Sequence, residues 1–154
     1  DYEPTRATRL IMDFVTDEVS NWYVRLNRKR FWKGEYNEDK KAAYQTLYTC
    51  LMTVAKLGAP VAPFYMEHLY QDLNKVTGLE TAASIHLTDF PVSDDSFINL
   101  DLEEKMELAQ TISSLTHSLR KKEKIKVRQP LSKIMIPVLD EKIWHQIDQY
   151  RSML

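Results

Sequence analysis

The sequence is poor in cysteine and contains no long hydrophobic run. Cys50 is its only cysteine, which excludes an intrachain disulfide framework and a thiolate metal site, and favours a cytosolic origin. No apolar stretch approaches the roughly 20 residues that a helix needs to cross a bilayer, and no secretory or transit signal is visible. We therefore expect a cytoplasmic protein that does not enter a membrane. Because the chain opens on Asp1 and closes inside a predicted helix, we expect it to be a piece of a longer protein.

The motifs of catalysis and metal binding are also missing. Three glycines, all at predicted helix ends, are too few for a glycine-rich phosphate loop, and there is no Gly-x-Ser-x-Gly elbow. The four histidines are scattered, without the i, i+4 pairing of a helical zinc motif. The acidic residues between positions 94 and 107 are typical of loops and helix starts, and not of a catalytic dyad. We expect no catalytic residue, no metal and no cofactor here, and interpret the chain as a binding module.

Positive charge is concentrated in two short segments, although the net charge is −1. The first basic segment, residues 25–33, carries five cations and no acid. The second basic segment, residues 120–128, carries six cations and one acid. Each has a formal charge of +5, so the rest of the chain carries −11. Two basic segments on an acidic body are typical of a protein that binds a polyanion, although two solvated faces would have the same composition.

Apolar spacing predicts a mainly α-helical fold, with helices over residues 5–32, 39–57, 62–76 and 101–121 and an ordered loop over 79–100. Glycine follows or closes the first three helices, as is common at helix ends. We expect the first helix to bury an apolar stripe along its first half. The stripe consists of Ala7, Leu10, Ile11, Phe14 and Val15, and the expected inner face of the 62–76 helix consists of Phe64, Leu69, Tyr70, Leu73 and Val76.

The pattern of apolar and polar residues changes after the second basic segment. Residues 133–138, "KIMIPV", are short, apolar and compatible with a β-strand, and a helical pattern follows from Asp140. A strand followed by a helix does not belong to a helical bundle. We therefore predict a helical bundle over residues 1–128 and the start of a separate α/β junction segment over 129–154.

The stretch "SNWYVRLNRKRFW", residues 20–32, combines aromatic rings with cations. Single-stranded nucleic acid is held by stacking on aromatic faces, worth roughly 1–3 kcal/mol per base, together with cations on its backbone. The amides of Asn21 and Asn27 add groups that can read base edges. Rings at helical spacing also commonly pack into a core, so the sequence leaves open which of these rings are exposed.

Several of these motifs resemble those of isoleucyl-tRNA synthetases, in their anticodon-binding helical domain. They are "YEPTRA" (2–7), "FV" (14–15), the stretch 20–32, "GAPVAPFYMEHLYQDL" (58–73), "SIHLTDFP" (84–91) and "KIKVRQPLSKIMI" (124–136). The resemblance covers nearly the whole chain. Its Trp-Tyr-Val-Arg and Arg-Gln-Pro-Leu pieces are specific, whereas the helical remainder also suits valyl and leucyl relatives.

The resemblance implies that the parent protein is a class I ligase that attaches L-isoleucine to its tRNA with ATP and Mg²⁺. The nucleotide-binding motifs of that family are absent here, so we expect the fragment itself to be inactive. Its implied partners are isoleucine tRNA and other domains of the same chain, with a monomer as the expected state. The alternatives are a helical protein-interaction or scaffold domain, and the equivalent domain of a valyl or leucyl enzyme. The candidate tRNA-binding residues are Asn21, Trp22, Tyr23, Arg25, Arg28, Lys29, Arg30, Lys126 and Arg128.

Overall fold

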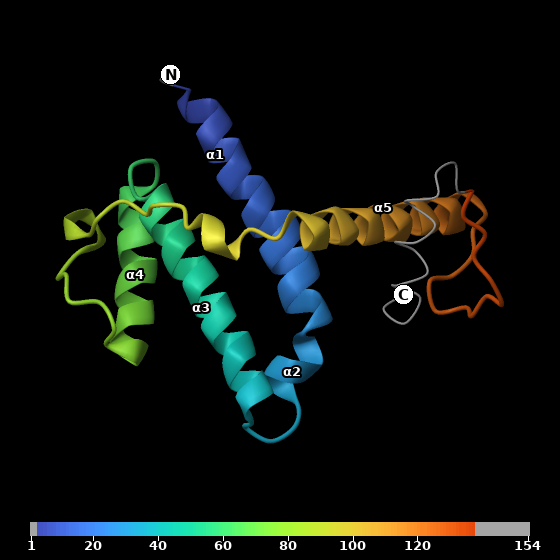
Figure 1. Cartoon of the computed structure of the whole chain (residues 1–154), viewed down its shortest axis with the longest axis horizontal. Coiled ribbons are helices and arrows are strands. Elements are labelled where there is room, and N and C mark those ends of the chain that lie inside the picture. The colour runs from blue at the N-terminus through green and yellow to red at the C-terminus, as the bar shows by residue number, and fades with distance from the viewer. Residues whose placement is uncertain (1–2, 138–154) are drawn as a thin grey trace. The chain divides into compact units, whose positions relative to one another are not determined.

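The computed structural model describes residues 3–137, and these form a mainly α-helical structure without β-strands (Figure 1). The predicted mainly α-helical fold is confirmed. The elements in chain order are α1 (Pro4–Asp13), the π-helical η1 (Phe14–Val24), α2 (Arg28–Trp32), α3 (Glu38–Gly58), α4 (Pro63–Thr77), the 3₁₀ turns η2 (Ile85–Leu87) and η3 (Asp95–Phe97), and α5 (Leu100–Lys122).

The chain divides into two compact units between Ser93 and Asp94. The first unit holds α1 to α4 and η2, and the second holds η3, α5 and the turn after it. Residues 133–137, where a strand is expected, have no regular secondary structure. The rest of that strand and the expected helix from Asp140 lie outside the described residues, so the predicted junction segment over 129–154 stays a prediction.

The ends of α3, α4 and α5 lie within one residue of their predicted positions. Polar side chains cap the starts of α3 and α5, whereas α4 begins at Pro63 without a side-chain cap. The side-chain oxygen of Asn37 accepts a hydrogen bond from the backbone N–H of Lys40 at 2.9 Å, at the start of α3. At the start of α5, the side-chain oxygen of Asn99 accepts a hydrogen bond from the backbone N–H of Leu102 at 3.1 Å. These N-caps satisfy backbone donors that have no partner inside the helix. α4 ends where Gly78 adopts a left-handed φ of 62°, which glycine accommodates without strain.

The core of the first unit lies between α3 and α4. Tyr70 is fully buried there, and its hydroxyl donates to the carbonyl oxygen of Ala82 at 2.8 Å. Gly58 leaves room for the Met66 side chain of α4, because a Cβ at that position would lie 2.7 Å from Cε of Met66. The buried residues of this core are Met52, Ala55, Ala59, Tyr70 and Ile85, with Tyr48, Met66, Leu69 and Leu73 packed against them.

The prediction of an inner face on α4 is wrong for two residues, because their side chains are exposed. Phe64 is 91% exposed and Val76 is 85% exposed. Each lies six positions from Tyr70, which at about 100° per residue places it roughly 120° around the helix from the buried tyrosine. The inner face of α4 is therefore narrower than the apolar pattern indicates.

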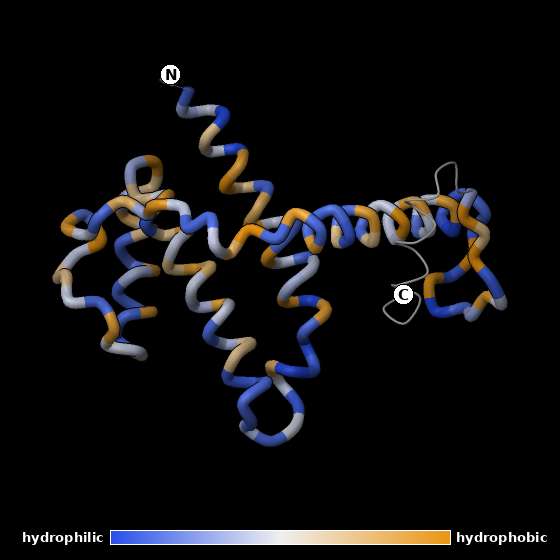
Figure 2. Tube along the Cα trace, viewed as in Figure 1, coloured by the Kyte–Doolittle hydropathy of each residue, from blue (hydrophilic) through white to orange (hydrophobic). Residues whose placement is uncertain are grey.

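The predicted burial of the first half of the first helix is also wrong. α1 has no buried residue, and Leu10 on its apolar stripe is 63% exposed. Hydrophobic and hydrophilic residues alternate along α1 (Figure 2). The part of the stripe nearest to α3 is only partly covered, since Ile11 and Val15 are half-buried. The first turns of α1 project beyond the neighbouring helices of the first unit (Figure 1). Within this segment of the first unit, burial begins only at Val19.

The carboxylate of Glu67 is one of the groups that connect α4 to the loop that follows it. Oε2 of Glu67 accepts hydrogen bonds from the hydroxyl of Ser84 at 2.9 Å and from the backbone N–H of Ile85 at 2.8 Å. Oε1 accepts from the amide of Gln71 at 2.8 Å. The bond from Gln71, followed by those from Ile85 and Ser84, lowers the pKa of Glu67 against the opposing effect of desolvation. Through Glu67 the loop presents Ile85 to the core.

We expect Glu67→Gln to reduce the free energy of unfolding at pH 7 by about 1 kcal/mol, because a charged acceptor of several hydrogen bonds is lost. A carboxylate with a lowered folded-state pKa contributes stability above its unfolded pKa of about 4.3, and this is lost as pH falls through the folded value. Urea unfolding between pH 7 and pH 3 should therefore show a shallower acid decline for Glu67→Gln than for wild type. The control is Glu35→Gln, an exposed residue in the loop after α2. Identical pH profiles for the two variants would contradict this role.

Candidate nucleic-acid interface

The segment that carries the first basic segment is not one regular helix. The predicted continuous helix over residues 5–32 is wrong, because η1 is π-helical and a turn at Asn27 separates it from α2. The backbone N–H of Arg25 donates to the carbonyl oxygen of Ser20, five residues back. The side-chain amide of Asn27 donates to the carbonyl oxygen of Tyr23 at 2.8 Å, so a side chain takes part in the backbone pairing at the break. Side-chain directions after residue 14 therefore depart from α-helical spacing.

Arg30 ties α2 to the start of α3. Its Nε and Nη2 donate to the two carboxylate oxygens of Asp39 at 2.8 and 2.6 Å, and its Nη1 donates to Oδ1 of Asn27 at 2.8 Å. A bidentate guanidinium–carboxylate pair is among the stronger and more directional hydrogen-bonded contacts in proteins. The bonds and the charge of Asp39 raise the pKa of Arg30. Arg30, one of the candidate tRNA-binding residues, is thus paired with an acid of the protein itself, in a contact that is partly exposed to solvent.

The aromatic rings of the stretch 20–32 have different environments. Phe31 is buried, and its ring lies edge-on to those of Tyr23, Trp32 and Tyr44, with centroid distances of 6.1, 6.1 and 5.2 Å. The hydroxyl of Tyr44 donates to the carbonyl oxygen of Phe31 at 3.0 Å, and that of Tyr23 to Ala43 at 3.0 Å. Such edge-to-face pairs stabilise packing beyond the area they bury. Tyr23 is therefore half-buried with its hydroxyl occupied.

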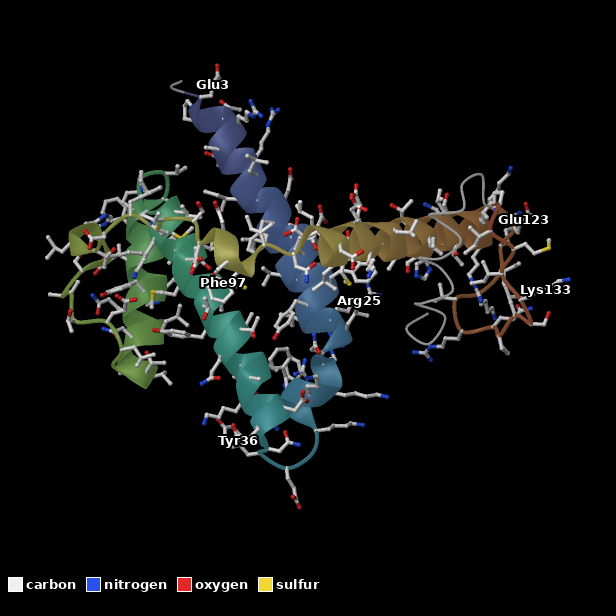
Figure 3. The ribbon with its side chains drawn as sticks, viewed as in Figure 1. Glu3, Arg25, Tyr36, Phe97, Glu123 and Lys133 are labelled. Atoms are coloured by element: carbon white, nitrogen blue, oxygen red, sulfur yellow. The ribbon has the colours of Figure 1, made fainter. Side chains whose placement is uncertain are left out.

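The remaining cations of the first basic segment are exposed. They are Arg25, Arg28, Lys29 and Lys33. Nitrogen-tipped side chains project from α2 and the loop after it, away from α3 (Figure 3). Asn21 is also exposed, with its amide nitrogen 3.5 Å from Oδ1 of Asp17, and Trp22 is half-buried. The structure brings these residues together on η1, α2 and the adjoining loop of the first unit.

Two residues of this surface are absent from the predicted set. Lys33 follows α2 directly, and Trp32 is its last residue, 68% exposed. The guanidinium carbon of Arg28 lies 6.0 Å from the centroid of the Trp32 ring. The sequence contains the signal for this contact, because residues four apart share a helix face. An arginine four positions before an aromatic ring therefore indicates a cation–π pair.

The second basic segment forms the end of α5 and the turn after it. The backbone N–H of Ile125 donates to the carbonyl oxygen of Arg120 at 2.8 Å, while Lys124 adopts a φ of 55°. This is the pattern of a helix that ends with a left-handed residue. The guanidinium of Arg120 donates to the carbonyl oxygens of Lys126 at 2.8 Å and Gln129 at 3.0 Å. The predicted contacts Lys126 and Arg128 are exposed in the turn that Arg120 organises.

The described part of the chain contains neither a metal-ligating cluster nor a membrane-spanning helix. Across residues 3–137, no three histidine, cysteine, aspartate or glutamate side chains gather where they could hold a metal ion. None of the helices in that range is long and apolar enough to span a bilayer. Burial raises the pKa of the Cys50 thiol, and a thiol that stays protonated is a poor nucleophile.

The sequence is similar over almost its whole length to a known domain. Residues 1–136 match the family model described as the anticodon-binding domain of tRNA ligase. The isoleucine–tRNA ligase of Cytophaga hutchinsonii is 62% identical over all 154 residues, and that of Bacteroides thetaiotaomicron is 55% identical over the same length. The isoleucine–tRNA ligase of Dehalococcoides mccartyi strain CBDB1 is 49% identical over 135 residues, 88% of the chain. The chain spans only 13–14% of the length of these relatives.

We expect Arg30→Ala to lower the melting temperature by a few degrees, because it removes the ion pair between α2 and α3 and leaves Asp39 without its guanidinium. Arg30→Lys should recover only part of the loss, since an ammonium cannot make the bidentate contact. The matched control is Arg28→Ala, which removes an exposed arginine of the same helix. Thermal unfolding followed by circular dichroism provides the measurement. Equal melting temperatures for Arg30→Ala and Arg28→Ala would show that the ion pair does not hold α2 in place.

Proposed function

The chain belongs to the anticodon-binding domain family of tRNA ligases, and from this we propose that it binds the anticodon region of isoleucine tRNA as part of an isoleucine–tRNA ligase. Relatives that carry that name match the chain over its whole length at 55–62% identity. They favour this function over a helical scaffold domain and over the corresponding valyl or leucyl domains. The observation in the structure that supports it best is the group of exposed cations on α2 and its flanks.

The parent protein would attach L-isoleucine to its tRNA with ATP and Mg²⁺. We assign that chemistry to parts of the parent outside this chain. The sequence contains no glycine-rich phosphate loop, and residues 3–137 gather no metal-binding set. We further propose that the parent acts as a monomer in the cytoplasm. The contribution of this chain is then to hold and select the tRNA while another domain performs the reaction.

The first basic segment would contact tRNA mainly through phosphates. Arg25, Arg28, Lys29 and Lys33 are exposed and carry full charges toward solvent, and phosphate contacts supply most of the sequence-independent affinity for nucleic acid. Within this proposal Arg30 and Tyr23 position α2 through their contacts with Asp39 and Ala43 of α3. Asn21 and Trp22 on η1 are the candidates for contacts to bases, and Lys126 and Arg128 are a second phosphate-binding group.

We expect Lys29→Gln to reduce the slope of log K against log salt by about 0.7–0.9, because each neutralised phosphate releases condensed counterions. Affinity for isoleucine tRNA and for an unrelated tRNA should fall alike, since a phosphate contact carries no sequence information. The measurement is fluorescence anisotropy with labelled tRNA at several salt concentrations. The matched control is Lys75→Gln, an exposed lysine on α4, which should keep the wild-type slope.

The same titration identifies the result that would overturn the proposal. If Lys29→Gln and Arg25→Gln both keep the wild-type affinity and slope, the first basic segment is a solvated face without a role in tRNA binding.

A further inference from the structure

Trp32 is a large ring held at the surface of the protein beside a cation. It closes α2 and is 68% exposed, whereas its neighbour Phe31 is buried. A single exposed hydrophobic residue needs no explanation. Trp32 differs because the guanidinium of Arg28 lies 6.0 Å from its ring centroid, and because Lys29 and Lys33 flank it within the first basic segment.

The position of the Trp32 ring is determined by the packing below it. Its ring meets that of Phe31 edge-on, with an interplanar angle of 82°. The Phe31 carbonyl accepts from Tyr44 at 3.0 Å, and the backbone N–H of Lys33 donates to Lys29 at 2.9 Å to close the last turn. The neighbouring Arg30–Asp39 pair holds the same turn against α3. A ligand that stacks on Trp32 would therefore meet a pre-organised surface, at a lower entropic cost than on a free side chain.

We propose that Trp32 is a stacking platform for one unpaired nucleobase of the bound tRNA, with Arg28 at its side. The proposal rests on the proposed tRNA binding and adds a contact outside the predicted set. An exposed indole with the Arg28 guanidinium over its ring, and with Lys29 and Lys33 close to it in the sequence, matches a ligand that is both planar and anionic. An unpaired nucleotide has both properties, because its base stacks while its phosphate meets the cations. An acidic peptide would use the charges alone and leave the ring uncovered.

The test is a double-mutant cycle. It compares how much hairpin affinity is lost when the Trp32 ring is removed, when one loop base is removed, and when both are removed. The probe is a labelled RNA hairpin with the anticodon stem and loop of isoleucine tRNA, together with a set of hairpins that each carry one abasic loop nucleotide. The proteins are the wild-type chain, Trp32→Phe, Trp32→Leu, and the control Phe64→Leu, which removes an exposed ring at the start of α4. Circular dichroism verifies the fold of each variant.

We expect Trp32→Leu to weaken hairpin binding by about 5- to 150-fold, the range that corresponds to the loss of one stacked base. Trp32→Phe should retain most of the affinity because it keeps an aromatic face. Phe64→Leu should bind like wild type. One abasic position should weaken binding to the wild-type chain and have little further effect on Trp32→Leu, because ring and base then belong to the same contact.

Two results would overturn stacking while leaving tRNA binding intact. One is wild-type affinity in Trp32→Leu, which would indicate a ring reserved for a protein contact. The other is an equal effect of every abasic position on wild type and Trp32→Leu. If the wild-type chain does not bind the hairpin at all, the proposed anticodon binding fails, and stacking on Trp32 fails with it. If Trp32→Leu is unfolded, the Trp32→Phe variant provides the test. Stacking requires that the abasic position that weakens binding to wild type also weakens binding to Trp32→Phe, and its absence there would overturn the proposal.

Discussion

The ion pair between Arg30 and Asp39 is the contact on which the candidate interface depends. It joins α2, a helix of only five residues, to the first turn of α3, and a third nitrogen of the same guanidinium engages Asn27 at the break before α2. A helix this short has little stability of its own. With Phe31 buried beneath it and Arg30 paired with Asp39, α2 exposes its other cations, Arg28 and Lys29, to solvent. Arg30 thus stabilises the position of α2, and Arg28 and Lys29 remain accessible to a polyanion.

This arrangement separates residues that position from residues that bind. Arg30, Tyr23 and Phe31 are occupied by partners inside the protein, while Arg28 and Lys29 on the same helix are exposed. The second unit shows the same division. The guanidinium of Arg120 donates to backbone carbonyls of the turn, while Lys126 and Arg128 in that turn are exposed. Charge in the sequence is thus a poor measure of charge available to a ligand.

The sequence predicted the parts of the fold that depend on local chemistry. Apolar spacing and the glycines at helix ends placed the ends of α3 to α5 within one residue. The structure adds that Asn37 and Asn99 cap the starts of α3 and α5, and that Gly78 ends α4 with a left-handed φ. It did not predict the π-helical segment or the exposed stripe of α1, because both depend on what packs against a helix. The commitment of Arg30 was equally hidden, since its partner Asp39 lies nine residues away across a loop. The contact between Trp32 and Arg28 could have been predicted, because the two residues are four positions apart on one helix.

Protection of individual lysines by tRNA would show directly whether the first basic segment lies against the bound nucleic acid. Wild-type protein is acylated with a lysine-reactive ester, with and without isoleucine tRNA, and the modified positions are quantified by mass spectrometry. If α2 presents its free cations to the phosphates, tRNA should suppress the reaction of Lys29 and Lys33 and leave that of Lys75 on α4 unchanged. Suppression that is equal at Lys29, Lys33 and Lys75, or absent from all three, would contradict the assignment of this surface to tRNA.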